Sequence, residues 1–288
     1  MENMNEIRQH IRAVTQTKKI TNAMHLVSSA RMKKVMHHVE YNRRYLSHVH
    51  SAMNHILASP GEVTHPYLQD RGQKRSTYVV ISGDKGLVGS YNADVLHFAL
   101  RHIRKHKDCH VVAVGITAAQ FFKKNGIVPD IEVIGASQDP SLYNARHMTQ
   151  DLFRLYDSGL TDNVYIIYTQ FVSSIKWMPH MEQLLPVPTD EEALKTITST
   201  EMIYHPSPEE MLNLLIPQYT MGILFGALVQ SYASEHCARM NAMRSASNNA
   251  DELLGQLQTQ LNMARQSAIT QELSEITGAA MALDTTEV

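Results

Sequence analysis

Hydrophobic side chains near the start of the chain recur at steps of three and four positions, the spacing of one face of an α-helix. Three groups carry the pattern: Ile7, Ile11 and Val14; Ile20, Met24 and Val27; and Leu46, Val49, Met53 and Ile56. Residues 1–59 contain no glycine and no proline, and the pattern stops at Ser59-Pro60-Gly61. The sequence therefore predicts a long N-terminal helix over residues 1–58 and a connector over residues 59–76.

The last part of the chain, residues 206–288, carries a second helical pattern. After Pro217, which we expect to kink or restart the helix, no proline follows. Apolar positions again step by three and four, through Leu254, Leu257, Leu261 and Ala264, and through Ile269, Leu273, Ile276, Ala280 and Leu283. This spacing predicts a C-terminal helix with a narrow apolar stripe suited to pairing with another helix.

Charge makes the two predicted helices suitable partners. Residues 1–50 hold nine basic and three acidic side chains, a net charge of +6, whereas residues 207–288 hold three basic and nine acidic ones, a net charge of −6. Helices that leave one globular body should run antiparallel, with Ile56 level with about residue 215 and Met4 near residue 267. The final 15–20 residues would then extend alone, and their apolar face predicts a surrounding protein.

The middle of the chain, residues 77–205, alternates between short apolar runs and amphipathic segments. The apolar runs predict strands at Tyr78–Ile81, Val111–Val114, Ile131–Ile134, Val164–Phe171 and Ile175–Leu185. Helices are predicted at residues 92–106, 118–124 and 141–156. This alternation predicts an α/β domain with a mostly parallel sheet and helices on its faces.

Composition narrows the classes of function. No apolar run approaches the roughly 18–20 residues of a membrane span, and the overall net charge of −2 argues against nucleic-acid binding by the whole protein. Cys109 and Cys237 fit no metal or redox spacing, which favours a reducing cytoplasmic setting. The 16 histidines form no metal-binding pattern with nearby acids, so we expect neither a metal ion nor a cofactor.

A glycine-rich segment, Ser82-Gly83-Asp84-Lys85-Gly86-Leu87-Val88-Gly89-Ser90, follows the first predicted strand. Phosphate-binding loops occupy this place, but Lys85 precedes the later glycines and Asp84 stands where a dinucleotide-binding loop has its second glycine. We favour a tight strand-to-helix turn over a nucleotide site. No serine, histidine and acid are spaced as a catalytic triad, so no catalytic residue is predicted.

Two polar surfaces are candidates for binding a partner. The first is a basic face on the N-terminal helix, formed by Arg8, Arg12, Lys18, Lys19, Arg31, Lys33 and Lys34. It suits an acidic protein surface, although a solvated helix face explains it equally well. The second is the segment Arg265 to Glu272, which combines polar donors and acceptors with an apolar stripe and is expected to contact whatever surrounds the helix end.

Three segments together resemble the gamma subunit of F-type ATP synthases. Lys18-Lys19-Ile20-Thr21-Asn22-Ala23-Met24 is similar to the TQKITKAM-like stretch of that family, and residues 82–92 are similar to its SDRGLCGGLN-like loop. Residues 264–273 closely resemble its RQAAITQEL motif. Within the loop, Gly83 is an addition, and Val88 and Ser90 replace a cysteine and a glycine of the family pattern.

The resemblance implies a fold, a function and a location. The fold would be an antiparallel coiled coil of the N- and C-terminal helices plus a Rossmann-like α/β domain. The function would be that of a rotor in the central stalk, which performs no bond chemistry itself and couples ion flow to ATP synthesis. Its implied partners are the alpha and beta subunits, the epsilon subunit and the c-subunit ring. The protein would lie on the cytoplasmic side of the inner membrane, held there only through the complex.

The resemblance also implies which residues contact the alpha/beta ring. They are Met24, Arg239, Arg265, Gln266, Thr270, Gln271 and Glu275. Two other classes stay open from the residues alone: a nucleotide-binding α/β protein with a coiled-coil arm, and a coiled-coil adaptor for nucleic acid.

Overall fold

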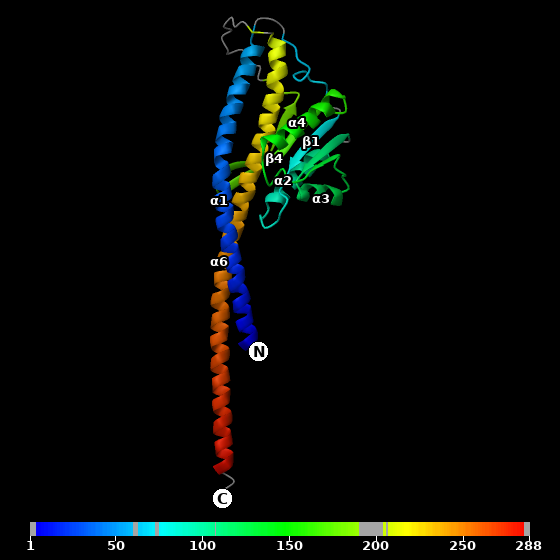
Figure 1. Cartoon of the computed structure of the whole chain (residues 1–288). Coiled ribbons are helices and arrows are strands. Elements are labelled where there is room, and N and C mark those ends of the chain that lie inside the picture. The colour runs from blue at the N-terminus through cyan, green and yellow to red at the C-terminus, as the bar shows by residue number, and fades with distance from the viewer. Residues whose placement is uncertain are drawn as a thin grey trace. The chain divides into compact units, whose positions relative to one another are not determined.

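The computed structural model describes residues 4–59, 63–72, 75–106, 108–189, 204–205 and 207–284, with side chains as far as residue 278. Two long helices, α1 (Met4–Leu57) and α6 (Pro208–Asp284), flank the α/β region in the sequence (Figure 1). The predicted N-terminal helix is confirmed and ends one residue before its predicted limit. Pro60 and Gly61, which prompted that limit, lie outside the described residues.

The α/β region contains the predicted strands and helices in the predicted order. The strands are β1 (Ser76–Ile81), β2 (Cys109–Val114), β3 (Ile131–Val133), β4 (Asn163–Ser173) and β5 (Lys176–Leu185). The helices are α2 (Tyr91–Ile103), α3 (Ile116–Lys124) and α4 (Leu142–Asp157). Bounds differ from the prediction by one to three residues at most ends, because the ends of elements depend on turns and caps rather than on periodicity.

The five strands form one sheet in the order β3-β2-β1-β4-β5. β1 pairs in parallel with both β2 and β4, and β2 pairs in parallel with β3. Only β5 is antiparallel, because it returns from β4 through a short turn. The mostly parallel sheet predicted from the sequence is confirmed.

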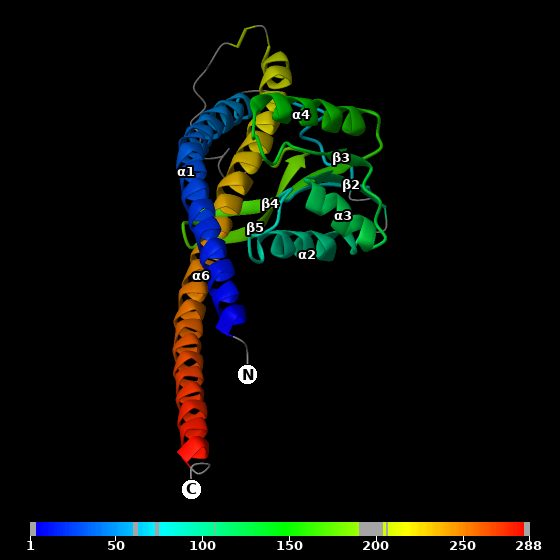
Figure 2. The ribbon, with the colours of Figure 1, turned by 60° about the horizontal axis from the view of Figure 1, so that its bottom comes forward.

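Alternate side chains of β1 enter two separate hydrophobic clusters. Tyr78 and Val80 join a cluster with residues of α2 and α3, whereas Val79 and Ile81 join a larger one with residues of α4 and α6. Figure 2 shows α2 and α3 on one side of the sheet and α4 on the other. Because both faces are covered, every residue of β1 is buried, as is usual for a central parallel strand.

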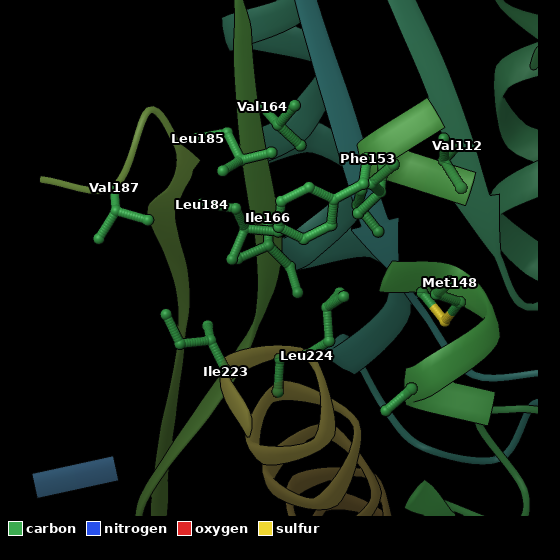
Figure 3. Packing of buried hydrophobic residues seen from close by; sticks show 14 of the residues in the cluster. Val112, Met148, Phe153, Val164, Ile166, Leu184, Leu185, Val187, Ile223 and Leu224 are labelled. Atoms are coloured by element: carbon green, nitrogen blue, oxygen red, sulfur yellow. The ribbon is translucent and has the colours of Figure 1, made fainter. Parts of the chain in front are cut away.

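The larger cluster joins the sheet to the first part of α6. In Figure 3, Ile223 and Leu224 of α6 lie beside Ile166 of β4 and Leu184 of β5. Met148 and Phe153 of α4 belong to the same cluster. The beginning of the C-terminal helix is therefore part of the core of the α/β region, which its helical periodicity alone did not predict.

The chain forms two compact units, each containing part of α1 and part of α6. One unit comprises Met1–Val27 with Met240–Val288, and the other comprises Ser28–Arg239. The domain boundaries predicted at residues 58, 76 and 205 follow changes in local pattern and stay a prediction.

The antiparallel pairing of α1 and α6 is visible inside each unit. In the first unit, Lys18 contacts Asp251, and Ser247 donates a hydrogen bond to Asn22 at 2.9 Å. This register places Met4 opposite about residue 265, close to the prediction, and residues 266–284 continue as helix beyond that point.

In the second unit, Asn42 donates to the carbonyl oxygen of Gly222 at 3.0 Å. Gly226 also lies against Asn42, Gly222 lies against Leu46, and the ring of Tyr219 contacts that of His50. These contacts place Ile56 opposite about residue 212, close to the predicted level near residue 215. Pro217 does not restart the helix, because α6 begins at Pro208 and continues through Pro217.

One helix in the described part of the chain, α6, contains a window long and apolar enough to cross a membrane, with a mean hydropathy of 1.5. The sequence pattern predicted no such segment. However, 56% of that window is buried inside the protein. Packing of α6 against the sheet therefore accounts for its apolar character.

Candidate partner-binding surfaces

The predicted contact residues near the end of α6 form an exposed polar surface. Arg265, Gln266, Thr270, Gln271 and Glu275 are all exposed. Within this set, Thr270 donates to the carbonyl oxygen of Gln266 at 2.9 Å, and Gln271 donates to the Glu275 carboxylate at 3.0 Å. The guanidinium of Arg265 and the amide of Gln266 thus face solvent as hydrogen-bond donors.

Exposed apolar side chains lie between these polar ones. Ile269, Leu273 and Ile276 are among the large hydrophobic residues that remain exposed in this structure. The register of the first compact unit places Met4 opposite about residue 265, so this stretch of α6 has no α1 residue facing it. A helix with exposed apolar and hydrogen-bonding side chains is typical of a surface that binds another protein.

Met24 lies in the same compact unit, near the contacts that pair the two helices. It is half-buried, while its neighbour Asn22 accepts the hydrogen bond from Ser247. Lys18, another predicted residue, forms an ion pair with Asp251. A charge introduced at Met24 would therefore enter a partly desolvated position next to the polar contacts that pair the two helices.

The predicted basic face is mostly exposed. Arg8, Arg12, Lys19, Lys33 and Lys34 are exposed side chains of α1. Arg31 is exposed as well, whereas Lys18 is half-buried and forms an ion pair with Asp251. Six of the seven cations are therefore available for an acidic partner.

Arg239 is in a different environment from the other predicted contact residues. Its side chain is only 9% exposed and forms an ion pair with Glu235, with Nη2 and Oε1 2.5 Å apart. Nη2 also lies 3.5 Å from the carbonyl oxygen of Gly86. The side chain of Arg239 is thus directed at the loop after β1 rather than at solvent.

The pKa values of two titratable groups beside Arg239, Glu235 and His236, are shifted. Burial raises the pKa of the Glu235 carboxyl, although the guanidinium of Arg239 acts in the opposite direction. Burial, together with the positive charges of Arg239 and Arg31, lowers the pKa of His236 to about 4. The ring of His236 is therefore neutral at pH 7, and its Nδ1 lies 3.4 Å from Nη1 of Arg239.

The glycine-rich loop between β1 and α2 is a tight turn, held by hydrogen bonds to other loops. Asp84 accepts hydrogen bonds from the backbone of Ile116, from Ser137 and from Gln138, at 2.7, 2.9 and 2.9 Å. The Ser82 hydroxyl accepts one from the backbone of Ala118 at 2.9 Å. Asp84 therefore places its own carboxylate at the N-terminus of α3.

These contacts oppose the nucleotide alternative. A phosphate bound in this loop would meet the carboxylate of Asp84 at the α3 N-terminus and that of Glu235 beside Gly83. Like charges at such short range are unfavourable. Among the residues that the structure describes, no group of three or more His, Cys, Asp or Glu side chains could hold a metal ion.

The sequence analysis did not single out Glu235, His236 or the bridging role of Asp84. The four-residue spacing of Glu235 and Arg239 was visible, because acid and base four positions apart on a helix face each other. Nothing in the sequence indicated that this pair is buried against the loop after β1, where Gly86 lies 153 residues before Arg239.

The family described as ATP synthase matches residues 3–283 of this chain. The chain is 39% identical over 284 residues to the ATP synthase gamma chain of Alkaliphilus metalliredigens, covering 97% of this chain and 98% of that relative. It is 36% identical over 289 residues to the gamma chain of Heliobacterium modesticaldum, covering 98% and 100%. Its fold is similar to that of a chain in the cryo-EM structure of the Euglena gracilis mitochondrial ATP synthase OSCP/F1/c-ring, with a TM-score of 0.70 at 15% identity. That match covers 99% of this chain and 95% of the other.

Proposed function

This chain belongs to the ATP synthase gamma-chain family, and we propose that it is the rotor subunit of the central stalk of an F-type ATP synthase. Such a subunit couples transmembrane ion flow to ATP synthesis by rotating inside the ring of alpha and beta subunits. The observation that carries this proposal is similarity to gamma chains along nearly the whole length of both proteins. The complex is membrane-associated, and we place this chain on the cytoplasmic side of the inner membrane, without direct insertion into the bilayer.

The proposed mechanism is a shift in conformational populations rather than bond chemistry. A helix pair with different side chains around its circumference binds each conformation of a surrounding subunit with a different affinity. As the pair rotates, each subunit meets a new face, and its preferred conformation changes in sequence. The mixed surface of α6 near its end, polar at Arg265 and Gln266 and apolar at Ile269 and Leu273, suits such unequal contacts.

We assign the contact with the alpha/beta ring to Arg265, Gln266, Thr270, Gln271 and Glu275, together with Met24. The exposed donors of Arg265 and Gln266 support this assignment, because a protein carboxylate or carbonyl can accept them. The exposed cations of α1 are proposed to face acidic side chains of the same ring. Arg239 is the exception, because its buried side chain can affect a partner only through the loop that it contacts.

The proposed partners can be identified by affinity purification of the tagged full-length chain from cells that express it. Recovery of alpha and beta subunits, with epsilon and the c ring, is the expected result. The isolated chain should also fail to bind ATP or ADP in equilibrium dialysis. Recovery of the chain without alpha and beta subunits would overturn the proposal.

The role of Met24 can be tested with Met24→Lys in the assembled complex. We expect fewer protons pumped per ATP hydrolysed, because the new cation enters a half-buried position close to the proposed acidic partner surface. Met24→Leu, which keeps the volume and adds no charge, is the matched control and should keep the coupling ratio. An unchanged ratio in Met24→Lys would contradict the assignment of Met24.

A further inference from the structure

Gly83, in the loop after β1, packs against α6. A Cβ atom built on Gly83 would lie 2.9 Å from Oε2 of Glu235 and 3.1 Å from Oδ1 of Asn92. The shorter distance is below that of real Cβ contacts, so an alanine there requires Glu235 to move. The space that a side chain at position 83 would need is thus occupied by the Glu235 carboxylate.

Arg239 fixes the orientation of that carboxylate. Oε1 of Glu235 faces Nη2 of Arg239 at 2.5 Å, while Oε2 faces Gly83, and the two side chains are only 10% and 9% exposed. Arg239 also reaches the carbonyl oxygen of Gly86. The ion pair therefore contacts the loop at two points, three residues apart.

Neighbouring contacts fix the rest of the loop. Asn92 bridges it internally, accepting from the backbone of Gly83 at 2.8 Å and donating to the carbonyl oxygen of Lys85 at 3.3 Å. Val88 is buried in a cluster with Tyr91 and Ala238, and the Tyr91 hydroxyl donates to the carbonyl oxygen of Ser231 at 3.0 Å. Both Ala238 and Ser231 lie on α6, so the loop is attached to that helix after its tip, as it is before the tip through Gly83 and Glu235.

The tip of the loop, Lys85-Gly86-Leu87, is exposed, as are Gly89 and Ser90 beyond the buried Val88. Leu87 is 63% exposed and has a φ of 62°, a left-handed conformation that a leucine rarely adopts. Surrounding contacts must hold such a backbone in place, since it is strained for a residue with a side chain. The tip is thus rigidly presented rather than free.

We propose that Glu235 and Arg239 are positioning residues: their ion pair, closed by Gly83, sets the conformation of the Lys85–Leu87 tip relative to α6 and makes the loop a joint that passes torque between α6 and the sheet. The part that concerns torque rests on the proposed rotor function, whereas the part that concerns the loop does not. A buried ion pair contributes little net stability compared with apolar side chains of similar size. The property to test is therefore whether the ion pair of Glu235 and Arg239 fixes the conformation of the loop, rather than how much stability it adds.

The first test measures trypsin cleavage after Lys85 in the folded, full-length chain. Cleavage after exposed Lys124, at the end of α3, is the internal reference. In Gly83→Ala we expect cleavage after Lys85 to accelerate about tenfold, because the displaced carboxylate releases the loop, while cleavage after Lys124 stays unchanged. Equal acceleration at both lysines, or at neither, would overturn the positioning role.

A matched double substitution tests whether Gly83 and Glu235 act as one unit. Glu235→Asp withdraws the carboxylate by one methylene, which weakens its contact with Arg239 but makes room for a methyl group at position 83. Each single variant should be cleaved faster after Lys85 than the natural chain. The double variant Gly83→Ala with Glu235→Asp should be cleaved more slowly than Gly83→Ala alone. Additive acceleration in the double variant would show two independent sites and contradict the proposal.

The second test measures protons pumped per ATP hydrolysed by the assembled complex carrying the same variants. Gly83→Ala should lower the ratio, and the double variant should restore part of it, in parallel with the trypsin result. A released loop with an unchanged ratio would overturn the torque role and leave the positioning role standing. Failure of the natural chain to assemble with alpha and beta subunits would instead overturn the proposed function.

Discussion

The two compact units place the same helix, α6, in opposite environments. In the unit that ends at Arg239, α6 is buried on most of its surface: Leu212, Ile216, Leu224, Leu228 and Cys237 are fully buried. In the unit that contains Met240–Val288, the buried positions of α6 are few, such as Met243 and Leu257. Both parts belong to one helix, which lacks only the backbone N–H of Pro217, so packing is what distinguishes them.

This difference shows that the two parts of α6 are stabilised in different ways. The first part is a core element whose side chains fill the space between the sheet and α1, and its stability comes from buried apolar area. The second part pairs with α1 through a narrow stripe and a few polar contacts, which leaves most of its surface available to partners. The following substitutions separate the two parts by their effect on stability, from the largest effect to the smallest.

Leu224→Ala should produce the largest loss. Leu224 is fully buried in the cluster that joins α6 to the sheet, so removing its side chain leaves a cavity. We expect the free energy of unfolding to fall by about 2–5 kcal/mol, measured by urea unfolding of the full chain. The matched control is Leu253→Ala on the second part of α6, where the leucine is 43% exposed and a loss below about 1 kcal/mol is expected. Equal losses would show that the two parts of α6 are not differently packed.

His236→Gln should change how stability depends on pH. The pKa of His236 is lowered in the folded chain to about 4, from 6.5 when unfolded. Between these values the unfolded state binds more protons, so the folded state loses stability as the pH falls from about 7 to about 4. The contribution of this one group to that loss is about 3 kcal/mol.

The variant should therefore lose less stability than the natural chain over this pH range, as measured by thermal unfolding at pH 7, 5.5 and 4. His10→Gln, a replacement on the exposed side of α1, controls for the change in residue type. Identical pH profiles for the natural chain and His236→Gln would contradict the buried, neutral state of His236.

Alanine at two glycines of α6 should have effects of opposite sign. A Cβ atom at Gly226 would lie 2.3 Å from Nδ2 of Asn42, which is buried and donates to the carbonyl oxygen of Gly222. Gly226→Ala should therefore lower the free energy of unfolding by about 1–3 kcal/mol, because the amide must give up that hydrogen bond. Gly255 has no atom within 4 Å of its Cβ position, so Gly255→Ala should raise stability by about 0.5–1 kcal/mol through helix propensity. If urea unfolding showed that both substitutions lower, or both raise, the free energy of unfolding, the predicted difference between Gly226 and Gly255 would be contradicted.

Lys18→Ala should have the smallest effect. The ion pair of Lys18 with Asp251 is partly exposed, and such pairs contribute about 0.2–1 kcal/mol. We expect a loss within that range that shrinks as the salt concentration rises, measured by thermal unfolding at 0.05 and 0.5 M NaCl. A loss above about 1 kcal/mol that does not change with salt would contradict this prediction. It would mean that Lys18 and Asp251 stabilise the helix pair as strongly as buried core residues do.

Periodicity predicted most of the fold, because helices and strands repeat their buried positions at different spacings. The N-terminal helix, the five strands and the mostly parallel sheet followed from such patterns. The restart considered at Pro217 does not occur, because the helix continues through that proline, whereas its beginning at Pro208 agrees with the helical pattern predicted over residues 206–288. The apolar content of residues near 212–228 was compatible with either an exposed stripe or a core helix, and only the position of the sheet distinguished them.

The site could be predicted to the extent that it depends on exposed side chains of one helix. Arg265, Gln266 and Thr270 are exposed, as expected from their place beyond the paired region, and their roles stay proposals. Arg239 could not be placed from the sequence, because its burial depends on Glu235 beside it and on Gly86 from a distant loop.

The sequence by itself determined the elements, the antiparallel pairing of two oppositely charged helices, and the family, because periodicity, charge and short motifs are properties of neighbouring residues. The tertiary structure alone decided that the first part of α6 belongs to the core and that Glu235 and Arg239 hold the loop after β1. Both depend on contacts between residues that are far apart in the chain, where burial and close approach are set by the packing of the whole fold rather than by any local pattern.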